Sequence, residues 1–489
     1  MKVEPGSWFL VSGSQFSVPG SQFSVLSSRF SLLGSQFLVP GSQFLVLTSR
    51  FLVPGSQFLV LGSRFLVPGS WVLVLGSQFS QHMQTDTFSL ARGFTATATA
   101  CGLKPNGALD MALITADVPC STAGLFTTNR VKAAPVIYDQ EILATNASAV
   151  RAVIVNAGNA NACTGPQGAA NCRAMAEMTA ERLGCRADQV LVLSTGVIGR
   201  QLDMIKVAQG IASLTGSTAH SGAGAAARAM MTTDTHPKVA SRTITVAERT
   251  VTIAGMCKGA GMIHPNMATM LAIVTTDAQA HPAQLDRALR IAANRSFNRI
   301  SVDGDTSTND TLLLLASGAS GVPVSDTPLT DELAFDDFTA TLTDVCIDLA
   351  KQIARDGEGA TRLVEITVSG AQDEQQAHQA ANAIARSPLV KTAIHGGDPN
   401  WGRILCAAGY SGAAIDPDRL ALWFGAPEAS IQLVAHGLPL DADLAAASAL
   451  LRQDPVFITL DLGLGDARTT VWTCDFSKEY VEINAHYTT

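Results

Sequence analysis

The chain has 489 residues, of which 15% are charged and 47% are hydrophobic, and its formal net charge is −8. This length corresponds to two or three domain-sized units with large cores. The acidic balance argues against a nucleic-acid partner, which requires a basic face. Nine cysteines are scattered along the chain without a C-x-x-C pair. This pattern indicates free thiols in a reducing compartment, which we expect to be the cytoplasm, and argues against disulfides and a zinc site.

Residues 6–79 repeat every seven positions, as in GSQFSVP and GSQFLVL, and phenylalanine keeps the register. A membrane helix needs roughly 20 uninterrupted apolar residues, and recurrent Gly-Ser and Pro-Gly exclude it. The same dipeptides exclude a coiled coil, and no single apolar region suits a signal peptide. We therefore predict that residues 1–82 form a low-complexity extension of short strand-like pieces. We expect this extension to be repetitive DNA translated upstream of a natural start at Met83, and to lie outside the folded enzyme.

From Phe88 onward the sequence alternates between short apolar runs and amphipathic stretches. Apolar runs bounded by polar residues predict buried strands, and apolar residues at three- and four-residue spacing predict helices. A turn is expected at residues 105–107, where Pro, Asn and Gly follow one another. The strands expected after residue 100 cover residues 111–115, 150–155, 190–193 and 270–274. The expected helices cover residues 167–184, 221–231, 282–295 and 331–355.

Two polar segments allow more than one interpretation. SVDGDTSTNDTLLLL, residues 301–315, invites comparison with a calcium-binding loop. The comparison fails because Thr308 stands where such a loop needs glycine, and Leu314 stands where it needs a bidentate glutamate. We interpret the segment as a hydrogen-bonded turn that enters a buried strand. The last residues, YVEINAHYTT, are expected to form a strand that ends in polar residues.

The most informative stretch is KGAGMIHPNMATMLAIVTTDA, residues 258–278, in which a glycine-rich loop precedes a buried strand. Thr269 lies at the junction. At such a place a hydroxyl can attack the preceding carbonyl, so that an ester replaces the peptide bond and water then resolves it. The freed α-amine has a pKa of roughly 8 and can act as the base for its own hydroxyl. The alternative interpretation is an ordinary loop that enters an ordinary strand.

KGAGMIHPNMATML resembles the self-processing motif of the ornithine acetyltransferase family, and the resemblance extends from about Phe88 to Thr489. It implies an α/β protein built as a layered α-β-β-α sandwich with mixed sheets. It also implies cleavage between Ala268 and Thr269 into an α segment, residues 83–268, and a β segment, residues 269–489. The two segments are expected to stay associated as an α2β2 assembly.

The resemblance also assigns roles to individual residues. Thr195 and Gly196, in the turn after a predicted strand, match the pair that forms the oxyanion hole, where a hydroxyl and a backbone N–H stabilise developing negative charge. Thr269 matches the nucleophile. The positions that match substrate contacts are Thr235, Lys258, Thr269, Glu358, Asn484 and Thr489. Without the resemblance, each of these residues also fits a plain turn, a solvated loop charge or a frayed end.

The implied reaction is acetyl transfer from N-acetylornithine to glutamate through an O-acetyl-threonyl enzyme. A covalent ester replaces one difficult step with two easier ones. This chemistry requires no metal and no organic cofactor, and whether acetyl-CoA is a further donor stays open. An amidase or aminopeptidase on the same scaffold is one alternative. A structural protein driven by the heptapeptide repeats is another, and neither alternative involves nucleic acid or a membrane.

Overall fold

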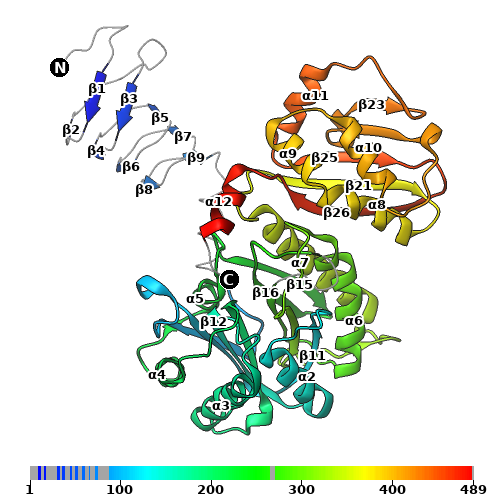
Figure 1. The fold of residues 1–489 in the computed structure, drawn as a ribbon. Coiled ribbons are helices and arrows are strands. Elements are labelled where there is room, and N and C mark those ends of the chain that lie inside the picture. Colours follow the sequence, from blue (N-terminus) through cyan, green and yellow to red (C-terminus); the bar gives the residue numbers. More distant parts are fainter. Residues whose placement is uncertain are drawn as a thin grey trace. The chain divides into compact units, whose positions relative to one another are not determined.

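The structure is a computed structural model that describes residues 88–264 and 270–486, together with nine short strands between residues 9 and 74. The chain divides into two compact units, Met1–Thr87 and Phe88–Thr489 (Figure 1). The second unit contains every residue that the resemblance assigns to the site.

The strands of the first unit pair in parallel, in the sheet orders β1-β3, β2-β4-β6-β8 and β5-β7-β9. Their bounds are β1 Phe9–Ser12, β2 Phe16–Ser17, β3 Phe30–Leu33, β4 Gln36–Leu38, β5 Phe44–Val46, β6 Arg50–Leu52, β7 Phe58–Val60, β8 Phe65–Leu66 and β9 Val72–Val74. Phe37 pairs with Phe51, and Phe51 pairs with Phe65. Equivalent repeat positions therefore face one another, and the expected short strand-like pieces are confirmed.

The second unit is built on a nine-stranded mixed sheet with the order β13-β12-β11-β18-β17-β16-β15, in which β10 pairs with β11 and with β14. The strands are β10 Phe94–Thr99, β11 Met111–Phe126, β12 Val150–Asn159, β13 Val190–Val197, β14 His220–Ser221, β15 Lys238–Val246, β16 Arg249–Lys258, β17 Leu271–Thr276 and β18 Thr311–Ala316. The long strand β11 extends well beyond the strand predicted at residues 111–115. Its first part pairs with β10 and β12, and after a register shift between Thr115 and Cys120 its second part pairs with β18.

This register shift divides the sheet into two halves that pack face to face. In β12, Val153 and Val155 join a core that Leu313 and Leu315 of β18 also enter. The alternate residues of each strand point outward, as the two-residue period of a strand requires. Ile154 packs with helices α3 and α4, whereas Leu312 and Leu314 pack with α6 and α7. The order of layers is therefore helix, sheet, sheet, helix, and the expected α/β fold with mixed sheets is confirmed.

The four predicted helices of these layers correspond to α3, α5, α6 and α7 and lie close to their predicted positions, whereas α2 and α4 were not predicted. Helix α5 packs between the two halves of the sheet. The bounds of these helices are α2 Ala134–Asn146, α3 Gly165–Leu183, α4 Met204–Leu214, α5 Ala223–Met230, α6 Pro282–Arg295 and α7 Phe335–Arg355. Helix α7 begins later than residue 331 because β20, Leu333–Ala334, first pairs with β19, Val324–Ser325.

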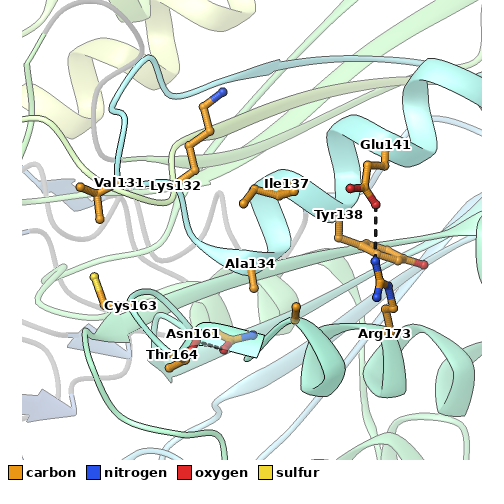
Figure 2. Close-up of a pocket in the computed structure, with 12 residues that line it drawn as sticks. Val131, Lys132, Ala134, Ile137, Tyr138, Glu141, Asn161, Cys163, Thr164 and Arg173 are labelled. Carbon is orange, nitrogen blue, oxygen red and sulfur yellow. Dashed lines mark hydrogen bonds and ion pairs between the residues drawn. The ribbon is translucent and has the colours of Figure 1, made fainter. Parts of the chain in front are cut away.

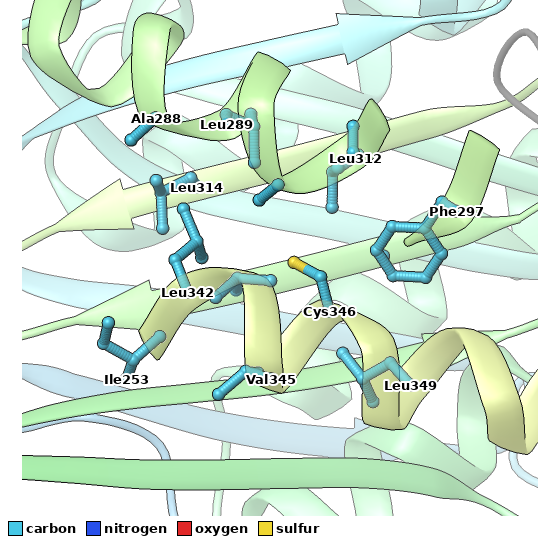
Figure 3. Packing of buried hydrophobic residues seen from close by; sticks show 14 of the residues in the cluster. Ile253, Ala288, Leu289, Phe297, Leu312, Leu314, Leu342, Val345, Cys346 and Leu349 are labelled. Atoms are coloured by element: carbon cyan, nitrogen blue, oxygen red, sulfur yellow. The ribbon is translucent and has the colours of Figure 1, made fainter. Parts of the chain in front are cut away.

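Figure 3 shows the outer core of the second half of the sheet. Its labelled side chains are Ile253 of β16, Leu312 and Leu314 of β18, Ala288 and Leu289 of α6, Phe297, and Leu342, Val345, Cys346 and Leu349 of α7. The apolar residues of α7 recur at helical spacing, so one face of the helix is buried while the opposite face carries its charges. Burial of each large aliphatic side chain stabilises the fold by about 1.5–3 kcal/mol.

A smaller sheet follows α7, with the order β24-β23-β22-β25-β21-β26 and its own core. Its strands are β21 Leu363–Ala371, β22 Ala421–Phe424, β23 Ile431–Ala435, β24 Leu438–Pro439, β25 Val456–Asp461 and β26 Ala467–Cys474. The accompanying helices are α8 Glu374–Arg386, α9 Pro388–Gly396, α10 Trp401–Gly409 and α11 Leu444–Leu451. Strand β26 contacts the loop before β18, because the Ser301 N–H donates to the Trp472 carbonyl at 3.0 Å and the Thr473 hydroxyl donates to the Ser301 carbonyl at 2.6 Å.

The strand prediction for the end of the chain is wrong, because Lys478–His486 forms helix α12. Tyr480 stacks on Phe476 with ring centroids 4.7 Å apart. The Asn484 side-chain amide donates to the Tyr480 carbonyl at 3.0 Å, four residues back. Contacts at this spacing suit a helix and not a strand. Within the parts of the chain that the structure describes, none of the helices combines the length and the apolar character that a membrane crossing requires.

Leu342→Ala tests the outer core. Leu342 is fully buried in α7, so the substitution should lower the free energy of unfolding by about 2–5 kcal/mol through lost burial and a residual cavity. Leu329→Ala is the matched control, because the Leu329 side chain is exposed and its loss should change stability by less than about 0.5 kcal/mol. Urea unfolding of both variants would measure the difference, and equal stabilities would contradict the packing described.

Candidate active site

A cavity of about 120 Å³ lies where the ends of several elements of the second unit meet. It is bounded by the ends of β13 and β16, the loop before β18, the turn after α7 and helix α12. Its lining residues are Ala160, Thr195, Gly196, Ile198, Thr232, Thr233, Lys258, Gly261, Met262, Asp303, Asp305, Ser307, Thr308, Asn309, Glu358, Tyr480 and Asn484. Hydroxyl, ammonium, carboxylate and amide groups therefore converge in a space suited to a small polar molecule.

Five of the predicted site residues line this cavity: Thr195, Gly196, Lys258, Glu358 and Asn484. Thr235 is not among the lining residues, although its neighbours Thr232 and Thr233 are. The predicted nucleophile and cleavage site, Thr269 and Ala268, and the predicted substrate contact Thr489 lie outside the described residues. Their roles stay predictions.

Gly196 follows Thr195 at a bulge between β12 and β13, where the strand register shifts at Gly158 and Asn159. Its φ of +130° favours glycine, and a Cβ at this position would lie 2.3 Å from the Gly158 carbonyl carbon. The Asn309 side-chain amide holds this strand end by donating to the carbonyls of Ala160 at 2.7 Å and Ser194 at 2.8 Å. The backbone at Thr195 and Gly196 is therefore fixed by neighbours on two sides.

Lys258 ends β16 and is buried at the cavity wall. Its ammonium donates a hydrogen bond to the Thr195 hydroxyl oxygen at 3.4 Å. Among the residues that the structure describes, no carboxylate forms an ion pair with this ammonium within 4.0 Å. Burial lowers the pKa of Lys258, and the charge of Asp234 opposes this effect. The ammonium is thus available to an anionic group that enters the cavity.

Glu358 lies in the turn that follows α7, and its carboxylate accepts a hydrogen bond from the Asn484 side-chain amide at 2.8 Å. The Glu358 N–H donates to the Ala260 carbonyl at 2.8 Å, which joins this turn to the loop after Lys258. The carboxylate lies against Gly261, where a Cβ would approach its Oε2 to 2.4 Å. A glycine at position 261 is therefore needed for the observed place of Glu358.

Thr235 lies behind the cavity wall, where its N–H and its hydroxyl both donate to the Asp356 carboxylate, the N–H at 3.0 Å. His236 also contacts this carboxylate, with 3.2 Å between Nδ1 and Oδ1. His236 is thus a loop residue that contacts Asp356 behind the cavity wall.

Three further lining residues were not assigned from the sequence: Asp303, Asp305 and Tyr480. Asp303 accepts hydrogen bonds from the N–H groups of Met262 at 2.5 Å and Ile263 at 2.9 Å. Burial raises the pKa of Asp303, and burial together with Asp303 raises the pKa of Tyr480. The density of polar residues in SVDGDTSTNDT, residues 301–311, was the feature of the sequence that could have identified the two aspartates as site residues. The segment is a hydrogen-bonded turn that enters the buried strand β18, as predicted.

A larger cavity of about 310 Å³ lies between α2 and α3 (Figure 2). None of the predicted site residues lines it. Its charged groups include Arg173 and Glu141, whose exposed side chains approach to 3.8 Å. The hydroxyl of Thr164 is occupied by a hydrogen bond to Asn161 at 2.7 Å. Because the buried polar groups converge in the smaller cavity, we take that cavity as the candidate active site.

Comparison with known proteins identifies the family. The model of the ArgJ family matches residues 95–489. The chain belongs to the ArgJ family. It is 48% identical over 399 residues to the arginine biosynthesis bifunctional protein ArgJ of Symbiobacterium thermophilum, which covers 81% of this chain and 97% of that protein. It is 44% identical over 425 residues to the mitochondrial arginine biosynthesis bifunctional protein ArgJ of Heterostelium pallidum, covering 84% and 96% of the two chains.

Among solved structures, the ArgJ protein of Bacillus halodurans is 42% identical, and the match covers 44% of this chain and 98% of that chain with a TM-score of 0.40. The resemblance to ornithine acetyltransferases is confirmed by the family match and by the relatives. The ArgJ chain described here is therefore an acyltransferase that transfers acetyl groups in arginine biosynthesis.

Gly196→Ala tests the strand end at the cavity. The added Cβ would displace the backbone of Gly158 or of residue 196 itself. If Gly196 is the oxyanion-hole donor that the resemblance predicts, acetyl transfer should fall by about 100-fold or more, the usual cost of losing one such donor. Gly199→Ala is the matched control, because Gly199 also has a positive φ, +79°, but no atom lies within 4 Å of its added Cβ. Steady-state rates and melting temperatures of both variants would separate lost activity from backbone strain. Equal activities would contradict the assignment.

Proposed function

We propose that this ArgJ chain transfers the acetyl group of N-acetylornithine to glutamate through an ester on Thr269. The observation that carries the proposal is the cavity in which Thr195, Gly196, Lys258 and Glu358, from separate parts of the chain, converge. Thr269 directly precedes Met270, which is described. The Met270 N–H donates to Asp310 at 3.0 Å, and the Thr311 N–H donates to the Met270 carbonyl at 3.0 Å. The backbone next to the proposed nucleophile is therefore held through both the N–H and the carbonyl of Met270.

The nucleophile is first produced by cleavage of the chain. The Thr269 hydroxyl oxygen attacks the Ala268 carbonyl carbon, the bond from this carbon to the Thr269 nitrogen breaks, and an ester forms. Water then hydrolyses the ester, which leaves a carboxylate on Ala268 and a free hydroxyl and α-amine on Thr269. The amine has a pKa of roughly 8, so near neutral pH a useful fraction is unprotonated and can take the proton of the hydroxyl.

Acetyl transfer follows in two halves. The Thr269 oxygen attacks the acetyl carbonyl of N-acetylornithine, and the bond to the substrate nitrogen breaks as that nitrogen receives the proton. Ornithine leaves, and the acetyl group remains as an ester on Thr269. The α-amine of glutamate attacks this ester, the ester bond to Thr269 breaks, and the proton returns to the threonine oxygen. Each half is easier than direct transfer between two amines.

Thr195 and Gly196 are the groups that we assign to the oxyanion. Lys258 donates to the oxygen of the Thr195 hydroxyl, so the hydroxyl proton stays free to donate elsewhere. A hydroxyl polarised in this way and a backbone N–H can both stabilise the negative charge that forms on the acetyl oxygen, and loss of one such donor typically costs about 3 kcal/mol.

The charges of the cavity suit substrates that are amino acids. We assign Lys258 to the substrate carboxylate, because its buried ammonium has no ion-pair partner within 4.0 Å among the described residues. We assign Glu358 to a substrate ammonium, because its carboxylate is buried and, among the described residues, accepts a side-chain hydrogen bond from Asn484 alone. Thr235, which binds Asp356, and Thr489 are assigned to substrate contact by the family resemblance.

We also propose that the two segments remain joined after cleavage. The cut would fall between β16 and β17, which pair antiparallel, and β18 of the second segment pairs with β11 of the first. Each segment alone would lose the neighbours of its central strands. The α2β2 assembly is proposed from the family resemblance, and size-exclusion chromatography with mass measurement tests it.

The cytoplasm is proposed as the compartment because all nine cysteines are free thiols.

Thr269→Ala tests the nucleophile. The variant lacks the attacking oxygen, so it should remain one uncut polypeptide on a denaturing gel and show no acetyl transfer. Thr327→Ala, at an exposed loop threonine, is the matched control and should be cleaved and active like the parent. N-terminal sequencing of the carboxyl-terminal parent fragment should begin at Thr269. Normal cleavage in Thr269→Ala would remove this residue from the mechanism.

A second donor is favoured by the word "bifunctional" in the names of the relatives. We propose that acetyl-CoA also acetylates Thr269, and that glutamate then receives the group. With acetyl-CoA as the sole donor, the protein should form N-acetylglutamate, and Thr269→Ala should not. Release of free CoA, measured with a thiol reagent, gives the rate. No product from acetyl-CoA, alongside normal transfer from N-acetylornithine, would show a single donor.

A further inference from the structure

Three charged side chains are buried together behind the cavity: Lys238, Asp234 and Asp356. The Lys238 ammonium lies 2.6 Å from Asp234 Oδ1 and 2.5 Å from Asp356 Oδ2, and its side chain is fully buried. None of the three lines the cavity. Taking such charges out of water is strongly unfavourable, so the arrangement demands compensation from close partners.

One carboxylate of this charged triad, Asp234, also binds backbone that forms the cavity, and the other, Asp356, lies close in sequence to Glu358. Asp234 accepts hydrogen bonds from the Gly259 N–H at 2.6 Å and the Thr232 N–H at 3.0 Å. Gly259 follows Lys258, and Thr232 lines the cavity. Asp356 follows the last residue of α7 and lies two positions before Glu358. The triad therefore links the loop of Lys258 to the turn of Glu358.

A second buried lysine shows that burial alone does not produce this arrangement. Lys391 is as buried as Lys238, but its ammonium donates to neutral groups, the Thr473 hydroxyl at 2.7 Å and the Cys474 carbonyl. Lys391 packs beside β26 of the smaller sheet. It contributes to the fold there, whereas Lys238 joins Asp234, which binds the cavity wall, to Asp356, which lies two positions before Glu358.

We propose that Lys238, Asp234 and Asp356 are positioning residues, which hold Lys258 and Glu358 in one arrangement and balance the charge that Lys258 carries. The proposal rests on the proposed function in one respect, namely that Lys258 and Glu358 bind the substrate. In this arrangement Asp234 stabilises the charged form of Lys258. Lys238 neutralises the excess negative charge of the two aspartates and repels Lys258.

The charges around Lys258 predict the direction in which Asp234 and Lys238 each shift the pKa of Lys258. The groups that affect its pKa are Asp234, Lys238, Glu358 and Asp310, and the Lys104 ammonium faces it as well. Burial lowers the pKa of Lys258, Asp234 raises it, and Lys238 lowers it. Removal of the Asp234 charge should therefore lower the pKa of Lys258, whereas removal of the Lys238 charge should raise it.

The test uses Asp234→Asn and Lys238→Met in the full chain, with Lys391→Met as the matched buried-lysine control. Lysine labelled with ¹³C at Cε reports each ammonium by NMR, and Lys258→Met identifies the signal of Lys258. The pKa of Lys258 should fall by about one pH unit in Asp234→Asn and rise by about one pH unit in Lys238→Met, as expected for a charge a few ångströms away. It should stay unchanged in Lys391→Met. In Lys238→Met, Asp234 keeps its two N–H donors, and the charge of Lys258 still lowers its pKa.

A merely structural role predicts lower melting temperatures without opposite pKa changes. Shifts in the same direction, or no shift in either variant, would overturn the proposal. If Lys238→Met does not fold, the fall in the Lys258 pKa in Asp234→Asn still tests the proposal. The double variant Lys238→Met with Asp356→Asn then replaces Lys238→Met, because it removes one positive and one negative charge together. The NMR titration needs no turnover. Opposite pKa shifts in a protein that shows no acetyl transfer would therefore support the role of the triad and contradict the proposed function.

Discussion

The pairing of β17 with its two neighbours is the constraint on which the rest of the structure depends. Lys258 of β16 lies opposite Leu271, and Leu271 lies opposite Thr311 of β18. All six residues of β17 are buried, so this register is fixed by packing on both faces. A slip of one residue would turn every side chain to the wrong face. The same register places Lys258, Asp310 and the start of β17 at one end of the sheet, where the cavity lies.

The large elements could be predicted from the sequence because their patterns are local. The apolar spacing of α7 and the apolar run of β17 need no knowledge of distant contacts, and both lie where they were expected. The tail could not be predicted in this way. Its alternation of Val481 and Ile483 with polar residues suits a strand, but the contacts of Tyr480 and Asn484 favour a helix.

The candidate site was only partly accessible from sequence. Resemblance supplied the separate residues, but their convergence in one cavity is a tertiary property that no local pattern carries. Thr235 illustrates the limit, since its hydroxyl binds Asp356 and not the cavity. The charged triad was not foreseen for a related reason. A lysine and an aspartate four positions apart are usually solvated, and only burial together with the distant Asp356 reveals that the three bind one another.

The position of α12 has a consequence for the genetics of this protein. The helix follows β26, the last strand of the smaller sheet, and contributes Tyr480 and Asn484 to the cavity wall. A premature stop codon just after Cys474 would leave every strand of both sheets in place. Such an allele could still yield a folded product, yet two groups at the cavity would be missing. Late truncations should thus behave as null alleles, and a purification handle is better fused elsewhere than at the carboxyl end.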